Sequence, residues 1–214
     1  MMIKTRKECC FYIMADRMMN RGVFTPNIRT RLRQLLFKDR IMDYLVCMRR
    51  YAYYKNTTPQ FKFLTPVHLL LKGYYKARFE SLGVRLGFCI GENCLGYGAV
   101  FHHHGTIVVG STNRIGNYAI LNTSTCIVNA GSKIGDAFFL GAGTIISKNV
   151  EIGDNVVVAA HSLVNHSFQD GHCLIAGSPA KEVKKADAWY KSLYTPEWNL
   201  RQQRIESLKN RMGL

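Results

Sequence analysis

The chain has 214 residues, a formal net charge of +15 at pH 7 and seven cysteines. An odd number of cysteines without a Cys-x-x-Cys pair indicates reduced thiols, and it excludes a disulfide framework and a zinc knuckle. No apolar run approaches the roughly 18 residues that would cross a bilayer, and no signal peptide is evident. We therefore expect a cytoplasmic protein, either free or peripheral to the inner membrane face.

The positive charge is concentrated at the front of the chain. Residues 1–85 contain 18 Lys and Arg against 5 Asp and Glu, whereas residues 86–164 contain 3 against 4. An anionic membrane surface is one candidate partner for such a segment, and scattered solvated charges explain the excess equally well. No nucleic-acid partner is expected, because no binding motif accompanies the charge.

Residues 1–85 form the first expected domain, an α-helical N-terminal region. Apolar residues at helical spacings predict helices over 4–20, over 30–55 and from Pro66 to about residue 82. The third helix mixes aromatic residues with Lys and Arg. We expect its apolar stripe to pack against a partner subunit, with a membrane-surface role as the alternative.

From about residue 86 the sequence repeats every six residues. The aliphatic positions are Ile115, Leu121, Ile127, Ile134, Leu140, Ile146, Ile152, Val158 and Val164. This period fits neither a helix nor long strict alternation, and it predicts a β-helix whose coils bury their apolar face only on each other. Glycine follows directly at four of these positions, residues 116, 135, 141 and 153, where we expect corners that need φ > 0.

The second expected domain, residues 86–181, is this β-helix, and residues 182–214 form a C-terminal helical extension. The spacing from Ile107 to Ile115 is eight, so two extra residues are expected there as a bulge or small loop. Short terminal helices are predicted over 187–193 and 196–212.

The chemistry is expected at His102-His103-His104, which precede Gly105-Thr106 and an Ile-Val-Val-Gly run. A histidine at a β-helix corner points outward, where a substrate can reach it. Its pKa lies close to working pH, so it can take a proton from a hydroxyl and return it to a leaving group.

This segment resembles the hexapeptide-repeat acyltransferases, most closely the serine O-acetyltransferase-like branch, which includes polysaccharide-biosynthesis O-acetyltransferases. In that branch a single His precedes a Gly/Thr-rich step, an I-V-V-G run and an eight-residue gap. The resemblance continues through residues 140–144, and residues 177–181 match the G-x-P-A-[KR] closure. His103 falls on the position of the catalytic base, with His102 and His104 beside it.

The resemblance implies a left-handed parallel β-helix that forms a homotrimer, with active sites between subunits and with trimers that could pair. Acetyl-CoA would be the co-substrate, and no metal is expected. Small residues at Ala142, Gly143 and Ala160 would line the pantetheine groove. Lys181, with Lys184 and Lys185 behind it, would meet the CoA phosphates; a solvated basic tail is the alternative for the last two.

The chain departs from that branch on the acceptor side. The position of the aspartate that orients the histidine holds Phe88, for which Glu92 is a candidate substitute, and residues 129–133 lack the loop with a second histidine. We therefore predict an O-acetyltransferase acting on a sugar hydroxyl of a capsular or surface polysaccharide precursor, either a small molecule or lipid-linked. The alternative is a true L-serine O-acetyltransferase of cysteine biosynthesis.

Two other functional classes are alternatives to an acetyltransferase: a zinc enzyme and a non-catalytic scaffold. His161 and His166 resemble two ligands of the gamma-class carbonic anhydrases, but the third should lie near residue 125, where only Cys126 is present. For these two histidines, exposed corners or interface hydrogen bonds are the simpler interpretation. A non-catalytic trimeric scaffold is the remaining alternative.

Overall fold

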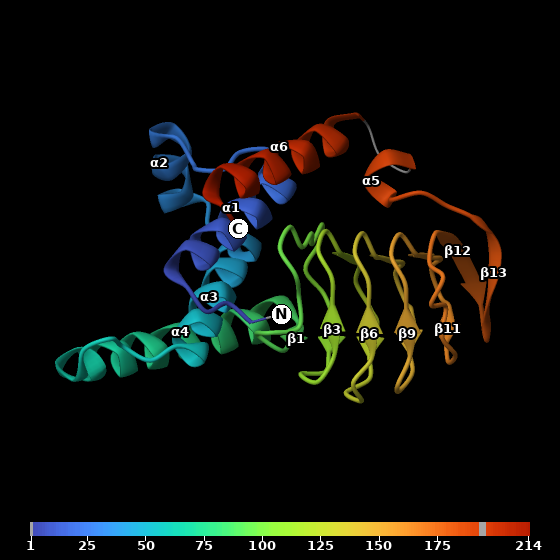
Figure 1. Cartoon of the computed structure of the whole chain (residues 1–214), viewed down its shortest axis with the longest axis horizontal. Coiled ribbons are helices and arrows are strands. Elements are labelled where there is room, and N and C mark those ends of the chain that lie inside the picture. Colours follow the sequence, from blue (N-terminus) through green and yellow to red (C-terminus); the bar gives the residue numbers. More distant parts are fainter. Residues whose placement is uncertain (1, 193–195) are drawn as a thin grey trace.

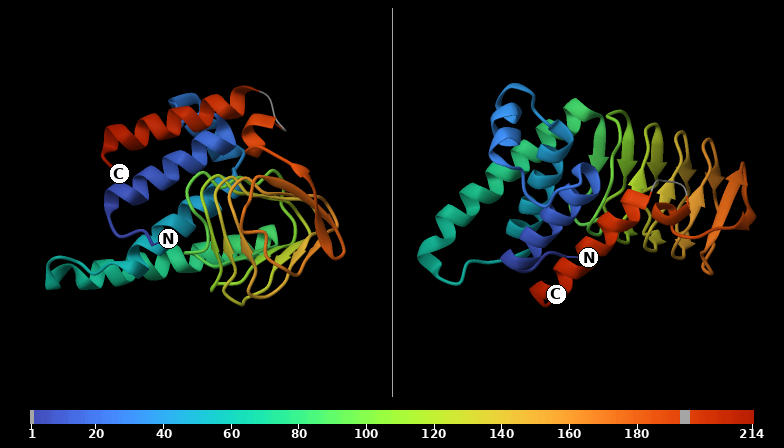
Figure 2. Two further views of the ribbon diagram at one scale, coloured as in Figure 1. Left: turned by 45° about the vertical axis from the view of Figure 1, so that its right-hand side comes forward. Right: turned by 90° about the horizontal axis from the view of Figure 1, so that it is seen from above.

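Helices stack on one end of a parallel β-helix (Figure 1). The computed structural model describes residues 2–192 and 196–214. The N-terminal elements are α1 (Arg6–Arg21), α2 (Ile28–Leu36), α3 (Arg40–Asn56), the 3-10 turn η1 (Lys62–Leu64) and α4 (Thr65–Leu86). After the β-helix, α5 (Trp189–Ser192) and α6 (Pro196–Met212) run back toward the helical end, and α6 lies beside α1 in every view (Figures 1 and 2).

The helices predicted near 4–20, from Pro66 and over 196–212 are confirmed as α1, α4 and α6. The single helix predicted over 30–55 is wrong, because the chain forms α2 and α3 with a break between them. Asp39 makes the break: its carboxylate accepts a hydrogen bond from the Met42 amide at 3.2 Å and so caps α3. Arg21 holds the same carboxylate through two contacts of 2.6 and 2.8 Å. The helix expected over 187–193 is shorter, and residue 193 lies outside the described residues.

Three sheets form the walls of the β-helix. The first, wall A, contains β1 (Phe88–Ile90), β2 (Ile107–Val109), β5 (Thr125–Ile127), β8 (Ile145–Ile146) and β11 (Leu163–Val164). Wall B contains β3 (Arg114–Ile115), β6 (Lys133–Ile134) and β9 (Glu151–Ile152). Wall C contains β4 (Ile120–Leu121), β7 (Phe139–Leu140), β10 (Val157–Val158), β12 (Cys173–Gly177) and β13 (Ala180–Lys185).

Paired strands run parallel within each wall, except that β13 returns antiparallel to β12. The predicted fold class, a left-handed parallel β-helix with an α-helical N-terminal region and short C-terminal helices, is confirmed. We call the corner between walls A and B corner 1, that between B and C corner 2, and that between C and A corner 3. All nine aliphatic positions of the repeat face the interior, with at most 5% of each residue exposed.

The glycines that follow the aliphatic positions allow neighbouring coils to stack closely, and they do not adopt the left-handed conformation. None of Gly116, Gly135, Gly141 and Gly153 has a positive φ, so that part of the prediction is wrong. A Cβ on Gly116 would lie 2.6 Å from the backbone carbon of Gly135 in the next coil, closer than real Cβ atoms come. In corner 2 the left-handed residue comes two positions later, at Tyr118, Ala137 and Asn155.

Aromatic side chains close the N-terminal end of the β-helix. The Phe88 ring lies 5.2 Å from that of Tyr44 on α3 and 5.1 Å from that of Phe101, and Tyr44 lies 5.0 Å from Phe79 on α4. All four rings are buried. Phe88, at the position that the resemblance gives to the aspartate, is therefore part of the core that joins the helices to the first coil.

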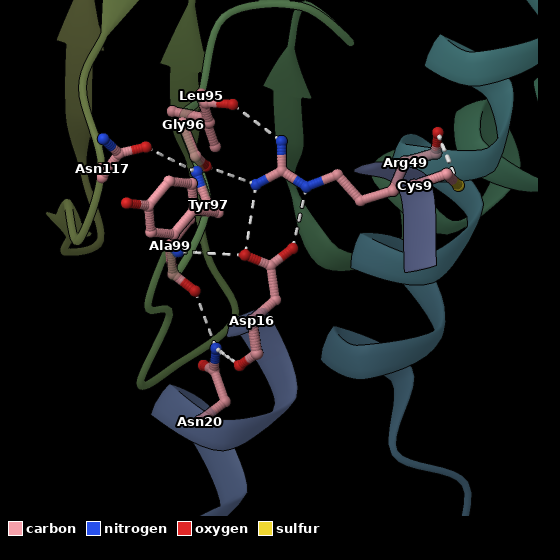
Figure 3. A network of polar contacts seen from close by, with 9 residues as sticks. All are labelled: Cys9, Asp16, Asn20, Arg49, Leu95, Gly96, Tyr97, Ala99 and Asn117. Atoms are coloured by element: carbon pink, nitrogen blue, oxygen red, sulfur yellow. Dashed lines mark hydrogen bonds and ion pairs between the residues drawn. The ribbon is translucent and has the colours of Figure 1, made fainter. Parts of the chain in front are cut away.

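A buried ion pair makes the same junction through polar contacts (Figure 3). Arg49 on α3 and Asp16 on α1 are both about fully buried, and two hydrogen bonds of 2.8 and 3.2 Å join them. The Arg49 guanidinium also donates to the carbonyls of Leu95 at 2.7 Å and Gly96 at 2.6 Å. Asp16 accepts from the Ala99 amide at 3.1 Å. These backbone groups belong to the first coil, which has no preceding coil to satisfy them.

Helix α4 exposes apolar side chains along the part that projects away from the β-helix (Figure 1). They include Val67, Leu69, Leu70 and Tyr74, each more than half exposed. The packing of this stripe against a partner subunit stays a prediction. No helix in the described ranges has the length and apolar character needed to span a membrane.

Replacing Arg49 should strongly destabilise the protein. Arg49→Met leaves the Asp16 carboxylate and two carbonyls buried without a cation, for which we expect a loss of roughly 3–5 kcal/mol in the free energy of unfolding. Urea unfolding followed by circular dichroism measures it. The matched control is Lys133→Met, which breaks an exposed pair with Glu151 and should change stability far less. Equal effects of the two substitutions would contradict this account.

Substitutions at two glycines should change the stability of the protein in opposite directions. Gly116→Ala forces neighbouring coils apart and should destabilise by roughly 1–3 kcal/mol. On α4 a Cβ at Gly73 meets nothing within 4 Å, so Gly73→Ala should stabilise by up to about 1 kcal/mol through helix propensity. Thermal unfolding of both variants tests the stacking argument, which fails if Gly116→Ala unfolds at the temperature of the parent.

Candidate active site

The three histidines lie in corner 3 of the first coil, and this corner is longer than those stacked on it. Val100 and Ile107 pair with Ile120 and Thr125 of the next coil. The first two are seven residues apart and their partners five, so the histidine corner contains two additional residues. The prediction of two extra residues between Ile107 and Ile115 is therefore wrong in place: Val109, not Ile107, is in register with Ile127.

Both ends of this longer corner are held by the helical region. Asn20 on α1 donates to the Ala99 carbonyl at 2.7 Å and accepts from the Phe101 amide at 3.2 Å. On the other side, the Gly105 amide donates to the carbonyl of Leu86 at 2.8 Å, and that of Ile107 to Gly87 at 3.0 Å, where α4 ends. The segment between these anchors, residues 102–104, is thereby presented outside the coil.

The histidines differ in their surroundings. His103 and His104 are exposed, and in the described part of the chain no hydrogen bond fixes the His103 ring, which lies 6.4 Å from that of His102. His102 is half-buried, 5.8 Å from the Trp198 ring on α6. Burial, and next the nearby His103 and Arg21, lower the pKa of His102 below its usual value. These surroundings favour the neutral form of His102, whereas the His103 side chain is open to solvent.

Within one chain, Glu92 does not lie beside His103, which it was predicted to orient. It follows β1 and precedes Leu95 of wall B, so it lies in corner 1, whereas the histidines lie in corner 3. Its carboxylate binds the Lys55 ammonium at 2.6 Å and accepts from Asn93 at 3.2 Å. For a single chain the prediction is wrong, because Glu92 and His103 belong to the same coil but lie in different corners of it.

The residues predicted to line the pantetheine groove stack in corner 3 of later coils. The Gly143 amide donates to the Thr123 carbonyl at 3.1 Å, and the His161 amide to the Ala142 carbonyl at 2.8 Å. Gly143 has φ +72°, and a Cβ there would lie 2.6 Å from Nδ1 of His161. Ala160 is exposed beside His161. These small residues thus form a continuous edge with the corner that carries His103.

Lys181 lies at the far end of the same edge. It is exposed on β13 opposite Ala176, next to the turn that ends β12 at corner 3. Lys184 and Lys185 face Leu174 and Cys173, farther from that corner, and Lys185 pairs with Glu182 at 2.8 Å. About four coil steps of ~4.8 Å separate Lys181 from His103, which suits an extended ligand lying along the edge.

Three residues near the histidines had no signal in the sequence: Asn20, Arg21 and Trp198. Asn20 and Arg21 end α1, and Trp198 comes from α6, where Arg201 lies 4.8 Å from its ring and donates to the Met19 carbonyl at 2.7 Å. Each lies some 80 to 95 residues from the histidine triplet in sequence. Only the fold brings them to corner 3.

The two histidines of the zinc alternative are not neighbours within the chain. His161 lies in corner 3, whereas His166 follows β11 in corner 1, 4.5 Å from the Phe168 ring. In the described ranges, no group of three or more His, Cys, Asp or Glu side chains is arranged to hold a metal ion.

Comparison with known proteins shows which proteins the chain is similar to. Residues 131–166 match the family described as "Bacterial transferase hexapeptide (six repeats)". The predicted resemblance is confirmed. Over 97 residues the chain is 33% identical to "Serine acetyltransferase 2" of Arabidopsis thaliana, a match that covers 42% of this chain and 30% of that relative.

Solved structures agree on the fold. A serine acetyltransferase in complex with CoA superposes with a TM-score of 0.53 and 20% identity, covering 82% of this chain and 68% of that one. Soybean serine acetyltransferase, as the apoenzyme, gives 0.56 and 21%, covering 80% and 67%. Because the chain spans under a third of the length of the curated relative, activity and substrates are proposals.

A bulky residue on the corner-3 edge should interfere with the binding of acetyl-CoA, the expected co-substrate. Ala160→Trp adds a large ring to an exposed position and should weaken acetyl-CoA binding by at least about tenfold, because the extended ligand then loses contact with the coil. Isothermal titration calorimetry measures the dissociation constant. Lys148→Trp, at an exposed position in corner 1 of the same coil, is the matched control and should bind normally. Normal binding by both variants would place the donor elsewhere.

Proposed function

We propose that this protein is an acetyl-CoA-dependent O-acetyltransferase with His103 as its general base. The observation that carries the proposal is the single edge that presents His103, Ala142, Gly143, Ala160 and Lys181 in the order that a thioester donor requires. The relatives named serine acetyltransferase support the reaction class.

In the proposed mechanism the His103 ring removes the proton of an acceptor hydroxyl. The oxygen attacks the thioester carbonyl, and the negative charge of the tetrahedral intermediate needs hydrogen-bond donors placed around its oxygen. Collapse breaks the carbon–sulfur bond and forms the acetyl ester. The proton held by His103 then passes to the departing thiolate, so the enzyme returns to its starting state.

The homotrimer implied by the resemblance, with active sites between subunits and possible pairing of trimers, belongs to this proposal. In one chain His103 is exposed and no described carboxylate orients it. A neighbouring subunit against corner 3 would exclude water from the edge and complete the acceptor side. The chain mass of 24.3 kDa makes a trimer readily distinguishable from the monomer.

Two acceptors are proposed, each on its own observation. L-serine is favoured by the names of the relatives. A sugar hydroxyl of a polysaccharide precursor is favoured because Phe88 is a core residue where a carboxylate would be needed, with 5% exposed. Release of free CoA from acetyl-CoA with L-serine, against a control without acceptor, separates the two. Serine-dependent release establishes serine, and its absence in protein that binds acetyl-CoA directs the search to sugar hydroxyls.

Replacing the base should abolish turnover and spare donor binding. For His103→Ala we expect a loss of at least about 100-fold in kcat, the usual effect of removing a general base. Its affinity for acetyl-CoA should stay within twofold of the parent, since His103 touches the reacting atoms and not the pantetheine. The readout is CoA release by thiol titration with the acceptor identified above.

The matched control is His166→Ala, an exposed histidine of corner 1, which should retain full activity. Full activity in His103→Ala would refute the assignment and direct attention to His102 or His104.

A further inference from the structure

A basic groove opens beside the histidine corner, between the N-terminal end of α3 and the C-terminal end of α4. It has a volume of about 340 Å³, and its lining includes Lys38, Asp39, Arg40, Arg85, Leu86 and His104. A smaller hollow of about 150 Å³ shares Lys38, Arg40 and Arg85 and adds Arg78 and Asp43. Four exposed cations therefore gather at one place beside His104, the residue that follows His103: Lys38, Arg40, Arg78 and Arg85.

Backbone contacts fix this position. Leu86 lines the groove and accepts the Gly105 amide at 2.8 Å, so the histidine corner is bonded to the residue next to Arg85. Asp39, which lines the other side, is held by Arg21, and Arg21 is close enough to His102 to lower its pKa. The groove and the histidine corner are thus parts of one hydrogen-bonded junction between the helices and the first coil.

The positive charges of the groove are only partly compensated: Asp43 of the adjoining hollow interacts electrostatically with Lys38 and Arg78. Lys38, Arg40 and Arg85 are exposed and make no hydrogen bond or ion pair in the described residues. The Asp39 carboxylate is committed to Arg21 through two contacts of 2.6 and 2.8 Å and to the α3 cap. Three like charges around one cavity repel each other, and a bound anion would remove that repulsion.

We propose that this groove binds the phosphate or diphosphate group of the hydroxyl acceptor and so directs its hydroxyl to His103. The proposal rests on the proposed O-acetyl transfer and names the class of its acceptor. Two arginines can present planar donor pairs to phosphate oxygens, and a phosphate carries nearly two negative charges at pH 7. Free L-serine carries no net charge at pH 7, so three cations attract it less than they attract a phosphate ester.

Inorganic pyrophosphate is the probe, titrated by calorimetry in the presence of saturating CoA so that the donor site is occupied. Arg40→Gln and Arg85→Gln should each weaken pyrophosphate binding roughly tenfold, and the double variant roughly 100-fold, because each loses a charge-assisted contact. The matched control is Arg211→Gln, which removes an exposed charge in the last turn of α6 and should bind like the parent.

The measurement does not depend on turnover, so its failure differs from failure of the proposed function. Acetyl-CoA affinity of the double variant should equal that of the parent. The proposal is overturned if the parent binds no pyrophosphate, or if the double variant and Arg211→Gln bind it equally well.

A second arm identifies the source of the phosphate. Sedimentation with vesicles of one part phosphatidylglycerol to three parts phosphatidylcholine is measured with and without pyrophosphate. If the groove takes a lipid headgroup, the parent sediments, and both pyrophosphate and the double substitution release it. If it takes a soluble phosphate, the parent stays in solution while calorimetry shows pyrophosphate bound. Sedimentation that neither treatment changes, with no pyrophosphate bound, places anion binding elsewhere and overturns the proposal.

Discussion

The buried pair of Arg49 and Asp16 is the interaction on which the arrangement of the molecule depends. A β-helix satisfies the backbone groups of each coil with the next coil, so its first coil leaves carbonyls and amides unpaired at the end. Arg49 takes up the carbonyls of Leu95 and Gly96, and Asp16 the amide of Ala99. The helices thus take the place of a preceding coil, and moving them away would leave these groups of the first coil unpaired.

The candidate site is a consequence of the same junction. Asn20, one turn after Asp16 on α1, holds Ala99 and Phe101 just before the histidines, and the end of α4 holds Gly105 and Ile107 after them. The corner between these anchors is two residues longer than its neighbours. The two extra residues do not fit into the regular path of the coil. The corner therefore projects outward, and His103 lies on the projecting part.

The charge distribution gains meaning from this geometry. The front of the chain is basic throughout, which in sequence reads as a solvated surface. Folding places Lys38, Arg40 and Arg85 around one groove beside the histidines. The edge proposed for the donor runs from the histidine corner along the later coils, and the groove proposed for the acceptor lies beside the helices that precede this corner. In this proposal both substrates meet at His103, as group transfer requires.

The sequence alone determined the β-helix and its nine inward positions, because a six-residue period fixes which residues share a wall. His103, the pantetheine-groove residues and Lys181 were predicted from the resemblance, and the structure places them along one edge. The sequence did not determine the break before α3, the role of the glycines or the place of the extra residues. These depend on contacts between coils and between helices far apart in the chain. Only the tertiary structure placed Glu92 and His103, which are near each other in sequence, in different corners of the coil, and brought Asn20, Arg21 and Trp198 to the histidines.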